Sequence, residues 1–212
     1  MEIIYLKSVN STHKYLQEYI KENGYHNPIA VFTSNQTNGI GSRNNKWEGQ
    51  KDNFYLSFVI SKENLPQDIE IQSLSIYFSF ILKDLLKSLN SNVWLKWPND
   101  FYINDKKIGG TITTISKELI YCGIGINFTN ISNNFESLDI EISADRLLNL
   151  YLNKLEYYPS WKHIFSKYSI EFQHSKKFYA TIDYKKVSLE NSILNDDGSI
   201  QIDNKKVFSL RW

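Results

Sequence analysis

The stretch KWPND at Lys96–Asp100, followed by KIGG at Lys107–Gly110, decides how the rest of this sequence is interpreted. Pro98 fixes its own φ and disfavours helix for the preceding Trp97, so a strand is expected to end here. The glycines that follow Lys107 allow a backbone to approach a bound molecule closely. Together the two segments predict a ligand site near the end of a strand.

The polar residues of these segments also have a plain structural interpretation. Asn99 and Asp100 would suit an ordinary turn, and Lys106–Lys107 would suit a solvated hairpin tip. As ligands, Asn99 and Asp100 would instead face phosphates and Mg²⁺. KWPND alone favours the turn, and its neighbours are needed to decide.

The glycines are distributed unevenly along the chain. Six of the nine form three close pairs, which are Gly39/Gly41, Gly109/Gly110 and Gly123/Gly125. Glycine weakens a strand, so any single pair would indicate a β-bulge or close packing. Three pairs together with a long polar loop favour a ligand that lies against the sheet.

Hydrophobic periodicity predicts an α+β (α/β) chain with a largely antiparallel or mixed sheet. Asn10–Ser11 offers an N-cap and Gly24 is a predicted stop for the first helix. A second helix over residues 71–89 carries apolar residues at helical spacing, so one face should meet the core. We expect strands at residues 2–7, 28–33, 54–60, 93–97, 101–104, 108–115 and 119–127, and further helices at 142–155 and 161–172.

The sequence changes character from about Lys176. Short alternating segments are broken by turns such as Asp196–Gly198, which predicts a meander of short strands. A region of under ~40 residues cannot bury a core alone, so it should pack on the main domain. We therefore expect one domain over residues 1–174 and a small domain over residues 175–212.

Bulk properties argue against several classes of protein. A formal net charge of +1 disfavours a nucleic-acid binder that uses a broad basic field. No apolar run reaches the ~18 residues of a membrane span. The first residues carry Glu2 and no long apolar segment, unlike a signal peptide. The single cysteine, Cys122, precludes an intrachain disulfide and fits a reducing cytoplasm.

The polar loop from Gln36 to Trp47 contains Arg43, the only one of the three arginines that lies in a glycine-rich loop. Arginine gives fixed bidentate recognition of phosphate or carboxylate. Trp47 would either stack on an adenine ring or join the protein's own core. The loop is therefore a candidate for binding an anion.

In order and spacing, these motifs resemble those of a biotin–protein ligase. The resemblance rests on Ser11-Thr12, on Gln36 ahead of the loop that ends at Trp47, on KWPND and KIGG, and on GIGIN at Gly123–Asn127. Individual motifs support the resemblance over roughly residues 1–127. Over the remainder of the chain, only the order of the expected elements supports it. It implies a mixed-sheet catalytic domain of the class II synthetase-like biotin/lipoate ligase type, with a small C-terminal SH3-like β-barrel.

The resemblance also implies a reaction in two steps. The carboxylate of biotin attacks the α-phosphate of ATP to give biotinoyl-AMP and pyrophosphate. A lysine of the biotin carboxyl carrier protein of a carboxylase, such as acetyl-CoA carboxylase, then takes the biotinoyl group. Because both reactants of the first step are anions, cations and Mg²⁺ are implied. Some relatives form homodimers, so a homodimer is possible.

Roles for individual residues follow from the resemblance alone. Lys107 and Arg43 are implied as catalytic. The implied biotin-binding residues are Ser11, Thr12, Gln36, Gly39, Lys107, Gly110, Gly123 and Gly125. The implied ATP-binding residues are Arg43, Lys46, Trp47, Asn99, Lys107 and Asn127, with Asp100 as a ligand of Mg²⁺.

Three departures set the chain apart from that family. The loop reads Gly39-Ile40-Gly41-Ser42 where G-R-G-R is frequent, which predicts weaker retention of the adenylate unless Arg43 compensates. His13 stands where asparagine is usual, and we assign it no role. No DNA-binding helix-turn-helix precedes the first helix, so the resemblance is to ligases without repressor function or DNA partner.

Two other functions remain open. A lipoate ligase shares the broad fold and the adenylation chemistry, although KWPND favours biotin. A non-enzymatic module that binds proteins through a sheet and a barrel would not need Asn99, Asp100 and Lys107 beside paired glycines.

Overall fold

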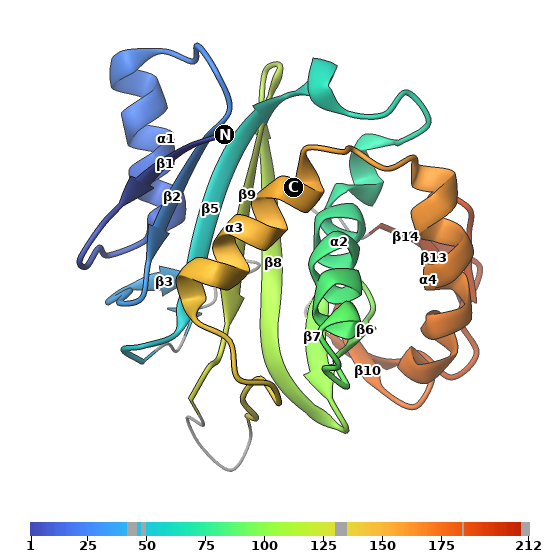
Figure 1. Cartoon of the computed structure of the whole chain (residues 1–212). Coiled ribbons are helices and arrows are strands. Elements are labelled where there is room, and N and C mark those ends of the chain that lie inside the picture. Colours follow the sequence, from blue (N-terminus) through green and yellow to red (C-terminus); the bar gives the residue numbers. More distant parts are fainter. Residues whose placement is uncertain (42–45, 48–49, 130–134, 184, 209–212) are drawn as a thin grey trace.

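The computed structural model of the chain describes residues 1–41, 46–47, 50–129, 135–183 and 185–208 (Figure 1). The helices are α1 (Thr12–Asn23), α2 (Leu74–Ser88), α3 (Ala144–Leu155) and α4 (Trp161–Ser175), with short 3-10 turns η2 (Lys62–Asn64) and η3 (Ile71–Ser73). The strands are β1 (Glu2–Tyr5), β2 (Ile29–Thr33), β3 (Gly39–Ile40), β4 (Lys46–Trp47), β5 (Phe54–Ser61), β6 (Trp94–Lys96), β7 (Asp100–Ile103), β8 (Lys106–Ser116), β9 (Leu119–Ile126), β10 (Tyr179–Ile182), β11 (Lys185–Ser188), β12 (Ile193–Leu194), β13 (Ile200–Ile202) and β14 (Lys205–Val207).

A seven-stranded sheet forms the centre of the fold, in the order β1-β2-β5-β9-β8-β7-β6. β1 and β2 run parallel, whereas the other neighbouring strands run antiparallel. The predicted α+β class with a mixed sheet is therefore confirmed. β8 and β9 form a long central hairpin, so the residues on its two faces decide what each side of the sheet can bind.

The two faces of the sheet are covered differently. On one face, the apolar residues 122, 124 and 126 of β9 join a large core with α2, α3 and α4, and Figure 1 shows α2 and α3 in front of the sheet. On the other face, Tyr121 packs with Leu16 of α1 in a smaller cluster. Because strand residues alternate, Gly123 and Gly125 follow Tyr121 on that face and leave it bare.

Helix α1 begins and ends where the sequence predicts. The Ser11 hydroxyl accepts a hydrogen bond from the Lys14 backbone N–H at 3.4 Å, as an N-cap does. Gly24 ends the helix with a φ of 78°, a left-handed value that suits glycine. Its N–H donates to the Ile20 carbonyl at 2.9 Å, so both ends of α1 are closed by local bonds.

Helix α2 differs from the prediction of one core-facing side. It begins at Leu74 after the turn η3, and nearly every residue from Leu74 to Leu86 is buried. The reason is its position, because α2 packs against α3, α4 and β8 at once. Among the described residues, no helix is long and apolar enough to cross a membrane.

The polar loop between β2 and β5 also contains structure that periodicity does not indicate. Gly39 pairs with Trp47 and Ile40 with Lys46, which forms the short antiparallel pair β3–β4. This pairing folds Trp47 back over the sheet. Strands of two residues are too short to show an alternating pattern in the sequence, so the prediction of a plain loop was wrong at these residues.

The C-terminal strands form two small sheets, β10–β11 and β12–β13–β14. Their apolar residues Ala180, Ile182, Leu189 and Ile200 belong to the same core as the central sheet. The prediction that this region packs on the main domain is therefore confirmed. Figure 1 shows the strands beside α4, at the β6–β7 end of the sheet.

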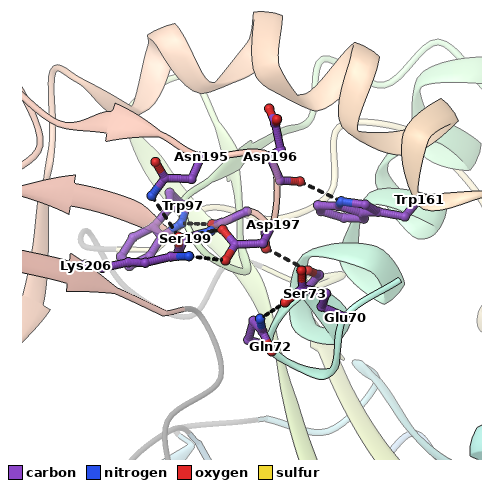
Figure 2. A network of polar contacts seen from close by, with 11 residues as sticks. Glu70, Gln72, Ser73, Trp97, Trp161, Asn195, Asp196, Asp197, Ser199 and Lys206 are labelled. Carbon is purple, nitrogen blue, oxygen red and sulfur yellow. Dashed lines mark hydrogen bonds and ion pairs between the residues drawn. The ribbon is translucent and has the colours of Figure 1, made fainter. Parts of the chain in front are cut away.

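A turn of the C-terminal region is docked into the main body by hydrogen bonds to three successive carbonyls, those of Asp196–Gly198 (Figure 2). They accept, in order, from Trp161 Nε1 at 2.7 Å, Ser73 Oγ at 2.6 Å and Trp97 Nε1 at 2.9 Å. The donors come from α4, η3 and the KWPND segment. The turn therefore ties the C-terminal strands to the segment that leads into Asn99.

The Asp197 carboxylate holds the shape of this turn. It accepts hydrogen bonds from the Ser199 N–H at 3.0 Å and hydroxyl at 2.5 Å, and it pairs with Lys206 Nζ at 2.7 Å (Figure 2). Burial alone would raise the pKa of Asp197. The bonds from Lys206 and Ser199 outweigh burial and place that pKa below its ordinary value. The carboxylate thus links the turn to β14.

Removing the Ser73 hydroxyl tests the docking of this turn. Ser73→Ala leaves the buried Asp197 carbonyl without its side-chain donor, so we expect the free energy of unfolding to fall by about 1–3 kcal/mol. Ser79→Ala is a matched control, because that fully buried hydroxyl only donates back to the Ser75 carbonyl of its own helix at 2.6 Å. Urea unfolding of both variants measures the difference, and equal losses would contradict the docking role.

Candidate active site

A cavity of about 530 Å³ lies over the bare part of the sheet, beside the start of α1. Its floor is backbone, because Gly110 of β8 pairs with Gly125 of β9 and Gly123 follows on the same face. The predicted site residues that line it are Ser11, Thr12, Gln36, Trp47, Asn99, Asp100, Lys107, Gly110, Gly123, Gly125 and Asn127. Residues from five separate stretches of sequence therefore meet around one cavity.

A β-bulge turns Lys107 toward this cavity. Phe101 pairs with Gly109 but Tyr102 pairs with Lys107, which leaves Ile108 as the extra residue of β8. Ile108 is fully buried in the core on the opposite face. Such a bulge shifts the side-chain alternation by one residue. Lys107 consequently shares the cavity face with Gly110.

Lys107 forms an ion pair with Asp100 above Gly110. Lys107 Nζ lies 2.5 Å from Asp100 Oδ1, and Lys96 Nζ lies 3.6 Å from the other oxygen. A Cβ at Gly110 would come within 3.2 Å of Asp100 Oδ1 and 3.5 Å of Lys107 Nζ. The absence of a side chain at Gly110 therefore leaves room for the pair.

The three charges set the protonation of this end of the cavity. Burial alone would raise the pKa of the Asp100 carboxyl, but Lys107 and Lys96 together hold that pKa below its ordinary value. Burial also lowers the pKa of Lys96, which Asp100 only partly offsets. Asp100 is therefore a carboxylate at neutral pH, already compensated by two lysines.

Asn99 is engaged by the protein itself at the cavity wall. Its side-chain amide donates a hydrogen bond to the Thr111 carbonyl, and the Thr111 N–H donates to the Asn99 carbonyl at 3.1 Å. This reciprocal pair holds the turn after Trp97 against β8. Asn99 therefore serves the turn, and it also lines the cavity together with Asp100. That the two residues face phosphates stays a prediction.

The opposite end of the cavity is polar and uncharged. Gln36 Oε1 accepts hydrogen bonds from the Thr12 N–H at 2.9 Å and the Thr12 hydroxyl at 3.2 Å. The same hydroxyl lies 2.8 Å from the hydroxyl of Ser57 on β5. Ser11 caps the helix beside them. Ser11, Thr12 and Ser57 are buried and Gln36 is partly buried, and these groups can exchange hydrogen bonds with a polar ring.

Trp47 and Asn127 flank the cavity near Lys107. A Cβ at Gly125 would come within 2.9 Å of the Trp47 indole, so this glycine is what lets the ring lie against the sheet. Lys107 Nζ lies 5.7 Å from the centre of that ring. Asn127 Oδ1 is buried and has no hydrogen-bond partner among the described residues. Both side chains line the cavity, away from the main core.

The remaining predicted residues are placed less directly. Gly39 does not line the cavity, because it packs between the Gln36 side chain and Trp47, where a Cβ would not fit. Arg43 and its neighbour Ser42 lie outside the described residues. The backbone of Lys46 pairs with Ile40, and its side chain is not among those described. The expectation that Arg43 compensates for the missing arginines stays a prediction.

Several lining residues were missed by sequence reasoning, namely His13, Tyr55, Ser57 and Phe135. A serine within the otherwise apolar strand FYLSFVIS is the signal that could have indicated Ser57. Phe135 gives no such signal, because it reaches the cavity through a bridge to Lys107 that links distant stretches of sequence. His13 was singled out in the sequence but received no role.

His13 is a buried, neutral histidine at the cavity wall. It is 6% exposed, and burial lowers its pKa to about 4. Its Nε2 lies 3.0 Å from the Thr114 hydroxyl. Tyr121 packs against the ring edge-on with 6.4 Å between ring centres, and burial raises the pKa of Tyr121. His13 therefore carries no charge at neutral pH.

The residues around Asp100 do not fit a metal ion held by the protein alone. Both carboxylate oxygens face lysine ammonium groups. Within the described ranges, no group of three or more histidine, cysteine, aspartate or glutamate side chains is placed to hold a metal. A magnesium ion would come with the phosphates of the nucleotide.

Comparison with known families decides where the chain belongs. A model of the biotin/lipoate A/B protein ligase family matches residues 5–127, which is more than half of the chain. The chain belongs to this family. The matched segment contains all of the predicted site residues, and it also contains Lys96 of the Asp100 cluster.

Two proteins with similar sequences are named as ligases. The bifunctional ligase/repressor BirA of Bacillus subtilis is 27% identical over 151 residues, which are 68% of this chain and 46% of BirA. Biotin–protein ligase 2 of Arabidopsis thaliana is 35% identical over 105 residues, 45% of this chain and 31% of that protein. The chain thus spans less than half of the length of these two ligases.

Solved structures of the family share the whole fold. The biotin acetyl coenzyme A carboxylase synthetase of Helicobacter pylori, crystallised with bound biotinylated ATP, is 39% identical with a TM-score of 0.92. The match covers 98% of this chain and 99% of that one. The biotin protein ligase of Aquifex aeolicus, 23% identical with a TM-score of 0.75 over 99% and 98% of the two chains, supports the fold alone.

The depressed pKa of His13 predicts how stability depends on pH. Between its ordinary pKa of about 6.5 and its folded pKa of about 4, the unfolded chain binds the proton and the folded chain does not. Lowering the pH through this window should therefore remove up to about 3 kcal/mol of stability. Urea unfolding at pH 7 and pH 4.5, compared with His13→Asn, isolates this residue. A variant that keeps the full slope would contradict the assignment.

Proposed function

We propose that this ligase-family member activates biotin with ATP and transfers the biotinoyl group to a lysine of a biotin carboxyl carrier domain. The observation that carries the proposal is one cavity with a glycine floor, uncharged polar groups at one end and Lys107 at the other. An acid with a polar ring and a carboxylate fits that polarity. Membership of the biotin/lipoate A/B protein ligase family supports it.

The first step has to bring two anions together. At ~4 Å two unit charges repel by about 4 kcal/mol at an effective dielectric of 20. Lys107 supplies a cation at this point, since it lies at the glycine floor and forms its ion pair with Asp100. We propose that Lys107 shifts from Asp100 to the carboxylate and the α-phosphate, while Lys96 continues to compensate Asp100.

The chemistry then balances in two displacements. A carboxylate oxygen of biotin attacks the α-phosphorus of ATP, and the bond to the leaving pyrophosphate breaks. The amine of the acceptor lysine next attacks the carbonyl carbon of biotinoyl-AMP, and AMP leaves with the bridging oxygen. Preorganised positive charge stabilises the oxygens that gain charge in both steps. Lys107 is the described residue best placed to provide it.

The remaining cavity residues receive positioning roles in this proposal. Ser11, Thr12 and Gln36 face the ring of biotin across Gly123, and Gly110 and Gly125 let the chain lie flat on the sheet. Trp47 and Asn127 flank the position of the adenine. Arg43 is proposed to approach the phosphates. Asp100 is proposed to hold Lys107 until the substrates bind, to stay paired with Lys96, and to face the magnesium complex of ATP.

The proposal also covers the substrates, the domains, the acceptor protein and the oligomeric state. The H. pylori synthetase carries biotinylated ATP in its crystal structure, which supports biotin and ATP as the substrates of this chain. We propose that residues 1–174 form the catalytic domain and residues 175–212 an SH3-like domain. The carrier of acetyl-CoA carboxylase is the proposed acceptor, in the cytoplasm, and the exposed edge strand β1 is a candidate for a homodimer contact.

Replacement of Lys107 tests the central role in this proposal. Lys107→Met should slow biotin-dependent release of pyrophosphate by about 10²–10³-fold, because it removes a preorganised cation from the reacting oxygens. Lys106→Met is the matched control, since Lys106 is exposed on the adjacent position of β8. A normal rate in Lys107→Met, or an equal loss in both variants, would contradict the mechanism.

Thermal-shift titration separates biotin from lipoate as the substrate. At a concentration of 100 times Kd, a ligand raises the free energy of unfolding by about 2.7 kcal/mol, or roughly 5–10 °C for a chain of this size. We expect that shift with biotin and not with lipoate, because lipoate has no polar ring group for Thr12 and Gln36. A larger shift with lipoate would reverse the substrate assignment.

A further inference from the structure

One polar atom at the cavity to which the proposed function assigns no role is Nδ1 of His13. This atom is buried and has no hydrogen-bond partner in the described part of the chain. A Cβ at Gly123 would come within 3.2 Å of it, so Nδ1 lies over the glycine floor. The ring is 6% exposed and lines the cavity. A buried polar atom without a partner is unfavourable unless a ligand supplies one.

The other ring nitrogen is fully used, which fixes the position of the proton. Gln17 Nε2 lies 3.4 Å from His13 Nε2 and 3.2 Å from the Thr114 hydroxyl. The nitrogen of an amide can only donate, so His13 Nε2 acts as an acceptor. The Thr114 hydroxyl accepts from Gln17 and donates to His13 Nε2 at 3.0 Å. The single proton of the neutral imidazole then sits on Nδ1.

Among the described residues, no acceptor lies within hydrogen-bond reach of Nδ1. On the floor, the side chain of Ile112 lies beside Gly123, as Nδ1 does, and the ring of Tyr121 packs edge-on with the imidazole. Tyr121 is the titratable side chain packed on this ring, and it is uncharged at neutral pH. The donor therefore lies at the cavity wall over Gly123, in an apolar frame. In such a frame, a hydrogen bond to a ligand oxygen is strengthened by the low local dielectric.

The distance from Lys107 indicates which part of a ligand this donor meets. Gly125 pairs with Gly110 beside Lys107, and Gly123 is two residues farther along β9, roughly 7 Å. An acid whose carboxylate lies at Lys107 would reach Gly123 with the far end of a short aliphatic chain. The head group of the acid, and not its carboxylate, would therefore lie under His13.

We propose that His13 is a binding and specificity residue, whose Nδ1–H donates a hydrogen bond to an oxygen on the ring head of the substrate acid. The inference rests on the proposed function, in which that acid is biotin and the oxygen is the carbonyl of its urea ring. His13 adds a donor to a site in which Thr12 and Gln36 already bond to each other. Gln17 and Thr114 act through His13 as positioning residues, because they fix its tautomer.

Calorimetric titration of the whole chain with biotin and with desthiobiotin tests this assignment. Desthiobiotin keeps the urea oxygen but lacks the ring sulfur. His13→Leu should weaken the binding of both acids by about 5- to 100-fold, the range expected when a buried hydrogen bond loses its donor. His13→Asn should restore most of the affinity, since the asparagine side-chain nitrogen takes the position of Nδ1. Melting temperatures of the ligand-free variants show that each is folded.

A second measurement needs no substitution. In nitrogen-15 NMR spectra of the wild-type chain, His13 should show protonation at Nδ1, and biotin should shift that N–H and protect it from exchange. An unshifted Nδ1–H in the biotin complex, unchanged affinity in His13→Leu, or loss with biotin but not with desthiobiotin would overturn the proposal. A wild-type chain that binds no biotin would overturn the proposed function as well, which separates the two failures.

Discussion

The contact between Lys107 and Asp100 above Gly110 is the interaction on which the site depends. It exists because a bulge at Ile108 moves Lys107 to the bare face of the sheet, and because Gly110 has no side chain in the way. A cation is thereby held 2.5 Å from a carboxylate instead of being free in water. Two anionic groups bound nearby can attract Lys107 more strongly than Asp100 alone does, while Lys96 continues to compensate the charge of Asp100.

The rest of the fold keeps that contact in place. The opposite face of the sheet is filled by a continuous core with α2, α3 and α4, so β8 and β9 cannot shift without breaking apolar packing. The turn at Asp196–Gly198 bonds to Trp97, and Asn99 bonds reciprocally to Thr111. The segment that carries Asp100 is therefore held from both sides. The C-terminal strands thus support the position of Asp100 through the packing of their turn, although they do not line the cavity.

Much of this could be predicted from the sequence, for reasons that differ between elements. Helix α1 is determined locally by Ser11 and Gly24. Of the paired glycines, Gly110, Gly123 and Gly125 mark the bare face of the sheet. Features that depend on tertiary contacts were harder to predict from the sequence. The burial of α2 on all sides, the β3–β4 pair and the bulge at Ile108 follow from neighbours far apart in sequence. His13 escaped assignment because only its unpaired Nδ1 in the folded structure shows what it can do.

The central claim is that the carboxylate of biotin attacks the α-phosphorus of ATP over the glycine floor. Biotin labelled with oxygen-18 in its carboxyl group tests this directly, in a complete reaction with ATP and a carrier domain analysed by mass spectrometry. The account predicts that the AMP product carries one oxygen-18 atom, because the bridging oxygen leaves with the phosphate. AMP without the label, or label in pyrophosphate, would contradict it.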